Sequence, residues 1–147
     1  MPTHAEKKEF IFSSEQMFDL VADIEKYPEF LPWCLDCKII KRTDNEMIAN
    51  MVIGYKLFRE WFGTRVTLDR PNTIRVEYVN GPLRHLSNRW TFTTRSDGGC
   101  IVDFYVDFEF KNPIFQKLMG AFFNEIVNRM VGAFDARARE LYANSIV

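Results

Sequence analysis

Cys34 and Cys37 are separated by two residues, a spacing that redox enzymes and zinc sites both use. A redox pair of this kind follows a strand and begins a helix, whereas here prolines precede the pair and a strand-like pattern follows it. A zinc site needs about four ligands, and only Cys100 and two distant histidines remain to supply them. We therefore interpret the cysteines as structural thiols and predict no bound metal.

Acid–base catalysis is the second chemistry to consider, and it usually depends on histidine. His4 lies close to the N-terminus and His85 lies in an expected loop, and neither neighbours a serine or cysteine in a recognisable motif. Asp103, Asp107 and Glu109 share one face of an expected strand, but no loop supplies the further oxygen ligands that a hard cation needs. Pairing with charges on the next strand explains these carboxylates. We predict that the protein is not an enzyme.

The aromatic content is high for the length of the chain. Its 147 residues include 14 Phe, 5 Tyr and 3 Trp, more than a minimal core requires.

The length fits one domain, which we place at residues 1–147. The formal net charge of -1 argues against a general nucleic-acid binder, so no DNA partner is expected. Without a long apolar run, a signal-peptide pattern or an even number of cysteines, the sequence is typical of a cytoplasmic protein.

Turn residues at intervals of about ten, with alternating apolar residues between them, predict an antiparallel meander. Ahead of it, a first strand is followed by a capping box at Ser13 and Gln16 and by one or two short helices. Asn112 and Pro113 suit the start of a long helix that is expected to reach about residue 143. The strands are expected at residues 4–12, 35–42, 46–55, 58–69, 73–80, 86–95 and 100–110.

The expected C-terminal helix carries a broad apolar stripe. Pairs of apolar residues recur every four positions from Ile114 to Val131, and each pair drifts about 40° around the axis. Gly120 and Gly132 lie within the stripe, where close approach to another surface would explain them. The apolar face of the sheet must be covered by another element, and this helix is large enough to cover it. We predict an α+β fold in which about seven antiparallel strands curve around the helix and leave an apolar cavity.

Apolar residues that face inward are the candidate ligand-binding residues, because sites for apolar ligands have mainly apolar walls and few polar groups that fix the ligand. The candidates are Met51, Ile53, Phe62, Val66, Ile74, Val76, Trp90, Phe92, Phe104 and Phe108 from the strands, and Phe122, Ile126 and Met130 from the helix.

Two aromatic segments are candidates for a cavity gate or a membrane contact, since aromatic loop tips suit both roles. One contains Phe30, Leu31 and Trp33, and the other contains Tyr55, Phe58 and Trp61.

The middle of the chain is basic. Residues 56–95 carry 8 basic and 3 acidic side chains. On neighbouring strands of this region, four arginines are expected to point outward as a basic patch. Such a patch suits anionic lipid headgroups or the phosphates of ribosomal RNA, and scattered solvated arginines are the third interpretation. The four are Arg59, Arg65, Arg75 and Arg89.

Several motifs along residues 3–143 resemble one known family. The most specific is Tyr27-Pro-Glu-Phe-Leu-Pro-Trp-Cys34, and weaker ones are Gly81-Pro82, Trp90-Thr-Phe92, Asp107-Phe-Glu-Phe110 and the segment from Met130 to Ala138. With them the sequence resembles the START-like superfamily of helix-grip lipid-binding domains. Within it, the sequence is similar to the ubiquinone-binding branch, which is described as coenzyme Q-binding or polyketide cyclase-like.

The resemblance implies a non-enzymatic protein that holds an isoprenoid quinone such as ubiquinone, supports respiratory electron transport as a carrier or chaperone, and contacts the inner membrane peripherally. It implies no cofactor besides this ligand. It also implies an alternative, because similar bacterial members are toxins that bind the large ribosomal subunit and block subunit association. A small-molecule cyclase is a third interpretation, but it needs an ionisable group inside the cavity, and the expected walls offer almost none.

Overall fold

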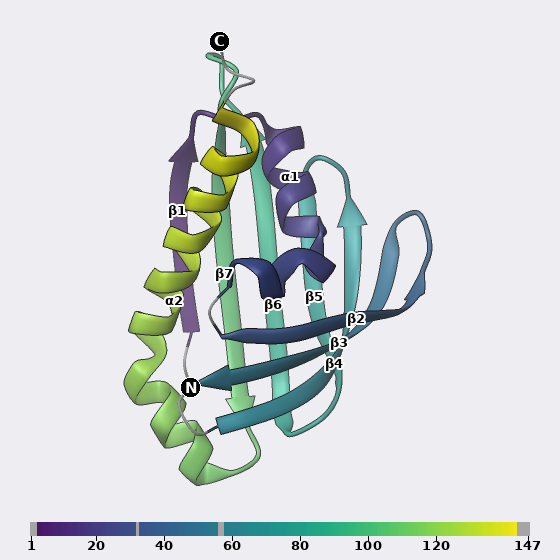
Figure 1. The fold of residues 1–147 in the computed structure, drawn as a ribbon, viewed down its shortest axis with the longest axis vertical. Coiled ribbons are helices and arrows are strands. Elements are labelled where there is room, and N and C mark those ends of the chain that lie inside the picture. The colour runs from purple at the N-terminus through teal and green to yellow at the C-terminus, as the bar shows by residue number, and fades with distance from the viewer. Residues whose placement is uncertain (1–2, 32, 56–57, 144–147) are drawn as a thin grey trace.

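Seven antiparallel strands form one curved sheet, and a helix of 30 residues lies across its concave face (Figure 1). The computed structural model describes residues 3–31, 33–55 and 58–143. The elements are β1 (Thr3–Phe10), α1 (Ser14–Ala22), the 3-10 helix η1 (Ile24–Glu29), β2 (Cys34–Arg42), β3 (Glu46–Tyr55), β4 (Phe58–Asp69), β5 (Thr73–Asn80), β6 (Leu83–Thr94), β7 (Cys100–Phe110) and α2 (Pro113–Tyr142).

The strand order is β1-β7-β6-β5-β4-β3-β2, so the meander from β2 to β7 is continuous and β1 returns to pair with β7. The predicted α+β architecture is confirmed, including the curved seven-stranded sheet, the short helices after the first strand and the long terminal helix. β6 begins earlier than expected. Gly81 adopts a positive φ of 136° in a tight turn, so the chain re-enters the sheet at Leu83, which pairs with Phe110 across a bulge.

The helix starts follow the local chemistry of the sequence. The Ser13 side chain accepts a hydrogen bond from the Gln16 backbone N–H, and the Gln16 side chain accepts one from the Ser13 N–H, which completes the capping box. Asn112 caps α2 by accepting from the Ile114 N–H at 2.9 Å, and Pro113 occupies the first helical position.

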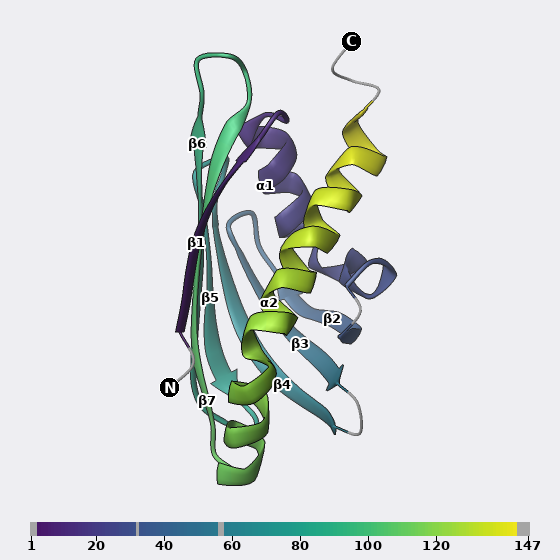
Figure 2. The same ribbon diagram turned by 90° about the vertical axis from the view of Figure 1, so that its left-hand side faces the viewer.

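The two ends of α2 have different surroundings (Figure 2). The C-terminal half lies beside α1, and the N-terminal half lies near the end of β3 and the start of β4. The closely packed core belongs to the first of these regions. It includes Phe12, Met17, Val21, Ile74 and Phe134, which are all 3% exposed or less. Within the described part of the chain, no helix combines the length and apolar character that spanning a bilayer requires.

The expectation for the two helix glycines is wrong. Gly120 and Gly132 are exposed, and a Cβ atom built at either position would have no heavy atom within 4 Å. Close approach to another surface therefore does not explain them. The apolar stripe is narrower on α2 than the pairwise pattern suggested, because one member of each pair faces partly to solvent.

Candidate ligand-binding site

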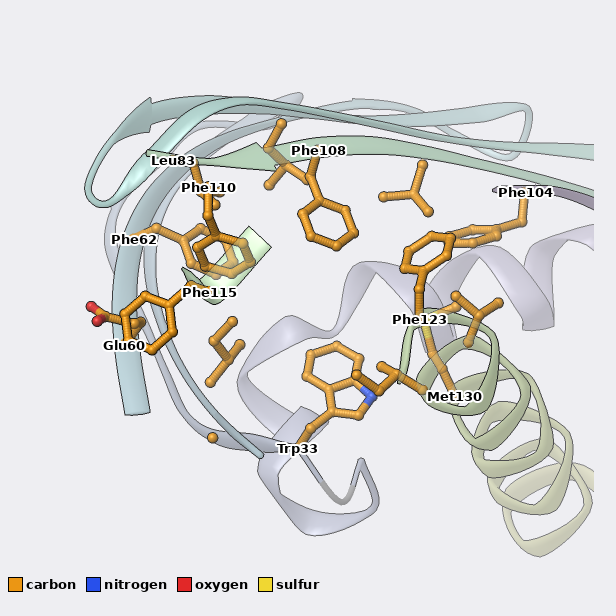
Figure 3. Close-up of a pocket in the computed structure, with 16 residues that line it drawn as sticks. Trp33, Glu60, Phe62, Leu83, Phe104, Phe108, Phe110, Phe115, Phe123 and Met130 are labelled. Atoms are coloured by element: carbon orange, nitrogen blue, oxygen red, sulfur yellow. The ribbon is translucent and has the colours of Figure 1, made fainter. Parts of the chain in front are cut away.

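A cavity lies between the N-terminal half of α2 and the lower part of the sheet (Figure 3). Its volume is about 160 Å³, and the empty space reaches about 970 Å³ when the open mouth is included. The walls come from four strands, α2 and the segment that joins η1 to β2. They consist of Trp33, Ile53, Gly54, Glu60, Phe62, Leu83, Leu86, Phe104, Val106, Phe108, Phe110, Phe115, Phe123, Ile126, Val127 and Met130.

The sheet side of the cavity follows from the alternation along β7. Phe104, Phe108 and Phe110 occupy every second or fourth position, so they share the concave face. On β6, Leu86 pairs with Phe108 and Leu83 pairs with Phe110, which continues the apolar surface across two strands. These large rings do not fill the space between the sheet and α2, and the cavity is the space that remains.

The helix side is one face of α2. Phe123, Val127 and Met130 are buried and succeed one another at the spacing of a helical face, and Phe115 lies two turns earlier. The Phe123 ring centroid lies 5.3 Å from that of Phe108, which is an attractive aromatic separation. α2 and β7 therefore touch beside the cavity.

The cavity contains very little polar chemistry. Among its described lining residues, Glu60 alone is ionisable, and Figure 3 shows its carboxylate pointing away from the surrounding rings. The second polar group is the indole N–H of Trp33, whose nitrogen is buried and has no hydrogen-bond partner. An arrangement of this kind can hold a neutral apolar molecule, and it offers no cation to a carboxylate or phosphate ligand.

Six of the predicted wall residues border the cavity: Ile53, Phe62, Phe104, Phe108, Ile126 and Met130. The other inward-facing strand residues lie elsewhere, because α1 and the C-terminal half of α2 cover their half of the sheet. The structure places Val66, Ile74, Trp90 and Phe92 in the packed core, with Met51 and Val76 packed against it. The helix residue Phe122 is half-buried and does not line the cavity, where the neighbouring Phe123 stands in its place.

The structure corrects the gate prediction for two of its six residues, Phe30 and Leu31. Leu31 is buried in the core, and Phe30 packs edge-on against Tyr27 and Phe134. Trp33 is the member of this segment that reaches the cavity.

The second proposed gate segment lies at the turn between β3 and β4. Trp61 is 48% exposed and alternates with the inward-facing Phe62, so it lies on the convex side of the sheet. Tyr55 and Phe58 end β3 and begin β4, and their side chains lie outside the described part of the structure.

The four predicted patch arginines are exposed and lie on neighbouring strands, Arg59 and Arg65 on β4, Arg75 on β5 and Arg89 on β6. Arg75 and Arg89 are directly opposite each other in the β5–β6 register. Arg65 points outward and forms an ion pair with Glu46 at 3.6 Å, so it does not contribute to the cavity.

The thiols have no reactive environment. Cys34, Cys37 and Cys100 are unpaired and buried. Burial raises the pKa of Cys34 to about 11 and that of Cys37 to about 12, with nearby acidic groups adding to both shifts. Neutral thiols are weak metal ligands and weak nucleophiles, and no group of three potential metal ligands occurs among the described residues.

Sequence reasoning missed ten lining residues. Val106 and Phe110 already stood on the inward face of the predicted last strand, so the signal for them was present. Leu83 was hidden because the predicted strand began only at residue 86, and Leu86, the first residue of that predicted strand, was not among the predicted wall residues. Glu60 and Gly54 carried no apolar signal, and the pairs on the helix did not show which member faces the sheet. The other four are Trp33, which had been assigned to a gate, and Phe115, Phe123 and Val127.

The family model for polyketide cyclase / dehydrase and lipid transport matches residues 12–135 of the chain. The chain belongs to this family. Ribosome association toxin RatA from Escherichia coli K12 is 36% identical over 132 residues, which cover 90% of this chain and 84% of that protein. Mitochondrial coenzyme Q-binding protein COQ10 homolog B from Xenopus laevis is 32% identical over 148 residues, which cover 98% of this chain and 61% of that protein.

Solved structures share the fold of this chain. One is a START superfamily protein from Mycobacterium smegmatis, which is 19% identical with a TM-score of 0.81, and the match covers 95% of this chain and 98% of that chain. The solution structure of an 18 kDa protein from Caulobacter crescentus is 30% identical, with a TM-score of 0.80, and the match covers 97% of this chain and 99% of that chain. The expected resemblance to START-like proteins is therefore confirmed. The relatives of this family carry names of both kinds that the sequence motifs suggested, a ribosome-associated toxin and a coenzyme Q-binding protein.

Proposed function

We propose that this protein binds an isoprenoid quinone of the ubiquinone type and carries it to or from the respiratory machinery of the inner membrane. The observation that supports this most is the cavity between α2 and the sheet, whose described walls are apolar apart from Glu60 and the Trp33 indole N–H. A quinone is neutral, flat and attached to a hydrocarbon tail, so it matches walls of this kind. The similarity to a coenzyme Q-binding protein supports the same choice of ligand.

The size of the cavity indicates which part of the ligand it takes first. An apolar cavity of about 150 Å³ holds one benzene ring, so the 160 Å³ present here suits a ring-sized group. A prenyl tail would continue out of the cavity through its open mouth. Each methylene that it buries contributes about 0.8 kcal/mol, so the tail supplies affinity without polar contacts.

The scarcity of acid–base groups in the described walls supports a binding role over a catalytic one. A cyclase needs an ionisable side chain that reaches its substrate. The described walls contain one, Glu60, and its carboxylate points away from the cavity. We propose a role without covalent chemistry, and we propose that exposed Trp61 and its strand neighbour Arg59 contact the lipid surface during exchange.

Native mass spectrometry of protein purified from a quinone-producing bacterium tests this function, together with solvent extraction and analysis of the bound lipid. The expected result is a complex whose added mass equals that of the quinone of the host cell. Ile126→Trp fills the cavity and should reduce loading at least tenfold. Ile114→Trp is the matched control, because Ile114 lies on the same helix but is 69% exposed. Equal loading of both variants, or no quinone in the unaltered protein, would contradict the proposal.

Ribosome association is the second candidate, and a specific feature of the convex face favours it. Arg75 and Arg89 stand opposite each other on β5 and β6, and neither forms an ion pair with a described residue. The Arg89 guanidinium lies 5.7 Å from the centre of the Tyr105 ring, and both guanidinium groups remain exposed. Two adjacent guanidinium groups without ion pairs suit phosphate oxygens of RNA. The similarity to ribosome association toxin RatA gives the second support.

Co-sedimentation with purified large ribosomal subunits tests the second candidate. Binding is expected to weaken steeply between about 50 and 200 mM salt, because phosphate contacts release counterions. The double variant Arg75→Gln/Arg89→Gln should lose binding, whereas Arg42→Gln on the distant edge strand β2 should retain it. Binding that is independent of these two arginines would exclude the convex face as the contact surface.

A further inference from the structure

Trp33 lies at the boundary of the cavity. It lies between η1 and β2, and its backbone carbonyl accepts a hydrogen bond from the Gly54 N–H at 2.9 Å. This bond ties the backbone of the segment to the end of β3. The ring forms the part of the wall that faces α2 (Figure 3).

The indole N–H of Trp33 is buried and unsatisfied. Buried tryptophans usually find an acceptor, and Trp90 in the same protein does so, since its Nε1 donates to Asn88 Oδ1 at 3.0 Å. A buried donor without a partner is unfavourable. Figure 3 shows the Trp33 nitrogen on the side of the indole that is turned toward α2. Because this nitrogen is fully covered, an acceptor reaches it only when the neighbouring side chains shift.

We propose that the Trp33 N–H is the polar anchor of the site and donates a hydrogen bond to a carbonyl oxygen on the ring of the ligand. This inference rests on the proposed binding function and specifies the chemistry that the site selects. The acceptor must be neutral, because the described walls contain no lysine or arginine and the one charge near them, that of Glu60, is negative. The site thus selects a ring that bears a carbonyl over a hydrocarbon of the same shape, and it disfavours fatty acids and phospholipids.

A matched pair of small probes tests this selection. Duroquinone (tetramethyl-1,4-benzoquinone) and durene (tetramethylbenzene) have nearly the same outline, but only duroquinone has carbonyl oxygens. Calorimetric titration or competition should show that the unaltered protein prefers duroquinone by about tenfold, which corresponds to one hydrogen bond of about 1.4 kcal/mol. Trp33→Phe should remove this preference while keeping the affinity for durene within about twofold. Trp61→Phe, the same substitution on the convex face, should leave the preference unchanged.

An NMR measurement on the unaltered protein makes the test independent of how well the variant folds. The three tryptophans give three indole ¹H–¹⁵N signals. The Trp33 signal should move downfield with duroquinone and not with durene. Equal affinity for both probes, or a preference that persists in Trp33→Phe, would overturn the anchor role and leave the quinone-binding proposal standing. If the unaltered protein binds neither probe and carries no quinone, both proposals fail together.

Discussion

Arg137 of α2 donates a hydrogen bond to the carboxylate of Glu29 in η1 at 2.9 Å. The same guanidinium lies 5.3 Å from the centre of the Phe30 ring and 3.3 Å from Glu140 Oε1. These contacts fasten the C-terminal half of α2 to the segment that precedes β2. The N-terminal half borders the cavity instead, so any movement of α2 that widens the cavity is expected to pivot about Arg137.

Replacing Arg137 should therefore weaken the fold. We expect Arg137→Ala to lower the free energy of unfolding by about 1–2 kcal/mol, because a charge-assisted hydrogen bond and a cation–π contact disappear together. The free energy of unfolding of Arg137→Lys should lie between that of the unaltered protein and that of Arg137→Ala, since an ammonium keeps the charge but loses the planar guanidinium geometry. Urea unfolding followed by circular dichroism gives these values, and an unchanged midpoint in Arg137→Ala would show that the contact does not fasten α2.

The same pair predicts a dependence on pH. The hydrogen bond from Arg137 lowers the pKa of Glu29 below its ordinary value. Because the folded pKa is depressed, the contribution of the pair is present above the ordinary pKa of a glutamate, about 4.3, and is lost as the pH falls through the lowered value. The difference in stability between the unaltered protein and Glu29→Gln should thus shrink as the pH is lowered from 7 to 3. A difference that grows on acidification would contradict this sign.

The two exposed glycines of α2 offer a route to a more stable protein. Since a Cβ atom at Gly120 or Gly132 meets no neighbour, alanine gains helix propensity without a clash, worth about 1 kcal/mol at each position. We expect Gly120→Ala and Gly132→Ala to raise the melting temperature additively, as measured by calorimetry. A loss of stability at either position would mean that the helix needs its flexibility there.

The buried thiols should resist alkylation. At pH 8 an ordinary cysteine with a pKa of about 8.5 is roughly one-quarter thiolate, whereas a pKa of about 11 leaves about 0.1%. Cys34 and Cys37 should react with iodoacetamide at least 100-fold more slowly in the native protein than after denaturation. The raised folded pKa also means that stability falls as the pH rises above about 9, since the unfolded thiols release protons first. Fast native labelling, read by mass spectrometry, would instead point to a reactive pair.

The facing arginines of the convex surface should repel each other. Like charges directly opposite on neighbouring strands are destabilising, so Arg75→Gln should raise the free energy of unfolding by a few tenths of a kcal/mol at low salt and lose that gain at high salt. Arg65→Gln is the matched comparison, because it removes an ion pair with Glu46 and should not stabilise. If both substitutions have the same effect, the opposition of Arg75 and Arg89 has no energetic consequence.

The fold was predictable from local patterns because each element agrees with its own sequence chemistry. The bounds predicted for β3, β4, β5 and β7 coincide with those observed, since turn residues mark both ends of these strands. The start of β6 was missed because a glycine at a positive φ makes the turn shorter than its residue types suggest.

The site was only partly predictable, for two physical reasons. Strand alternation tells which residues face inward, as at Phe104 and Phe108, but not which half of the sheet a short helix such as α1 fills. A broad helical stripe also fails to distinguish neighbours, so Phe122 was expected where Phe123 stands. Trp33 lies in an irregular segment with no periodicity, and a bond from the Gly54 N–H to its carbonyl, which local sequence does not predict, holds that segment at the end of β3.

The curved sheet has two open sides, because β1 and β2 end the strand order without pairing to each other. Both edge strands carry several charged side chains, such as Lys7 and Lys8 on β1 and Lys38 and Lys41 on β2. Bringing two molecules together along these edge strands would desolvate the charged side chains. The charged edge strands therefore protect a protein with an apolar cavity from edge-to-edge aggregation. Neutralising those lysines should promote assembly into long polymers.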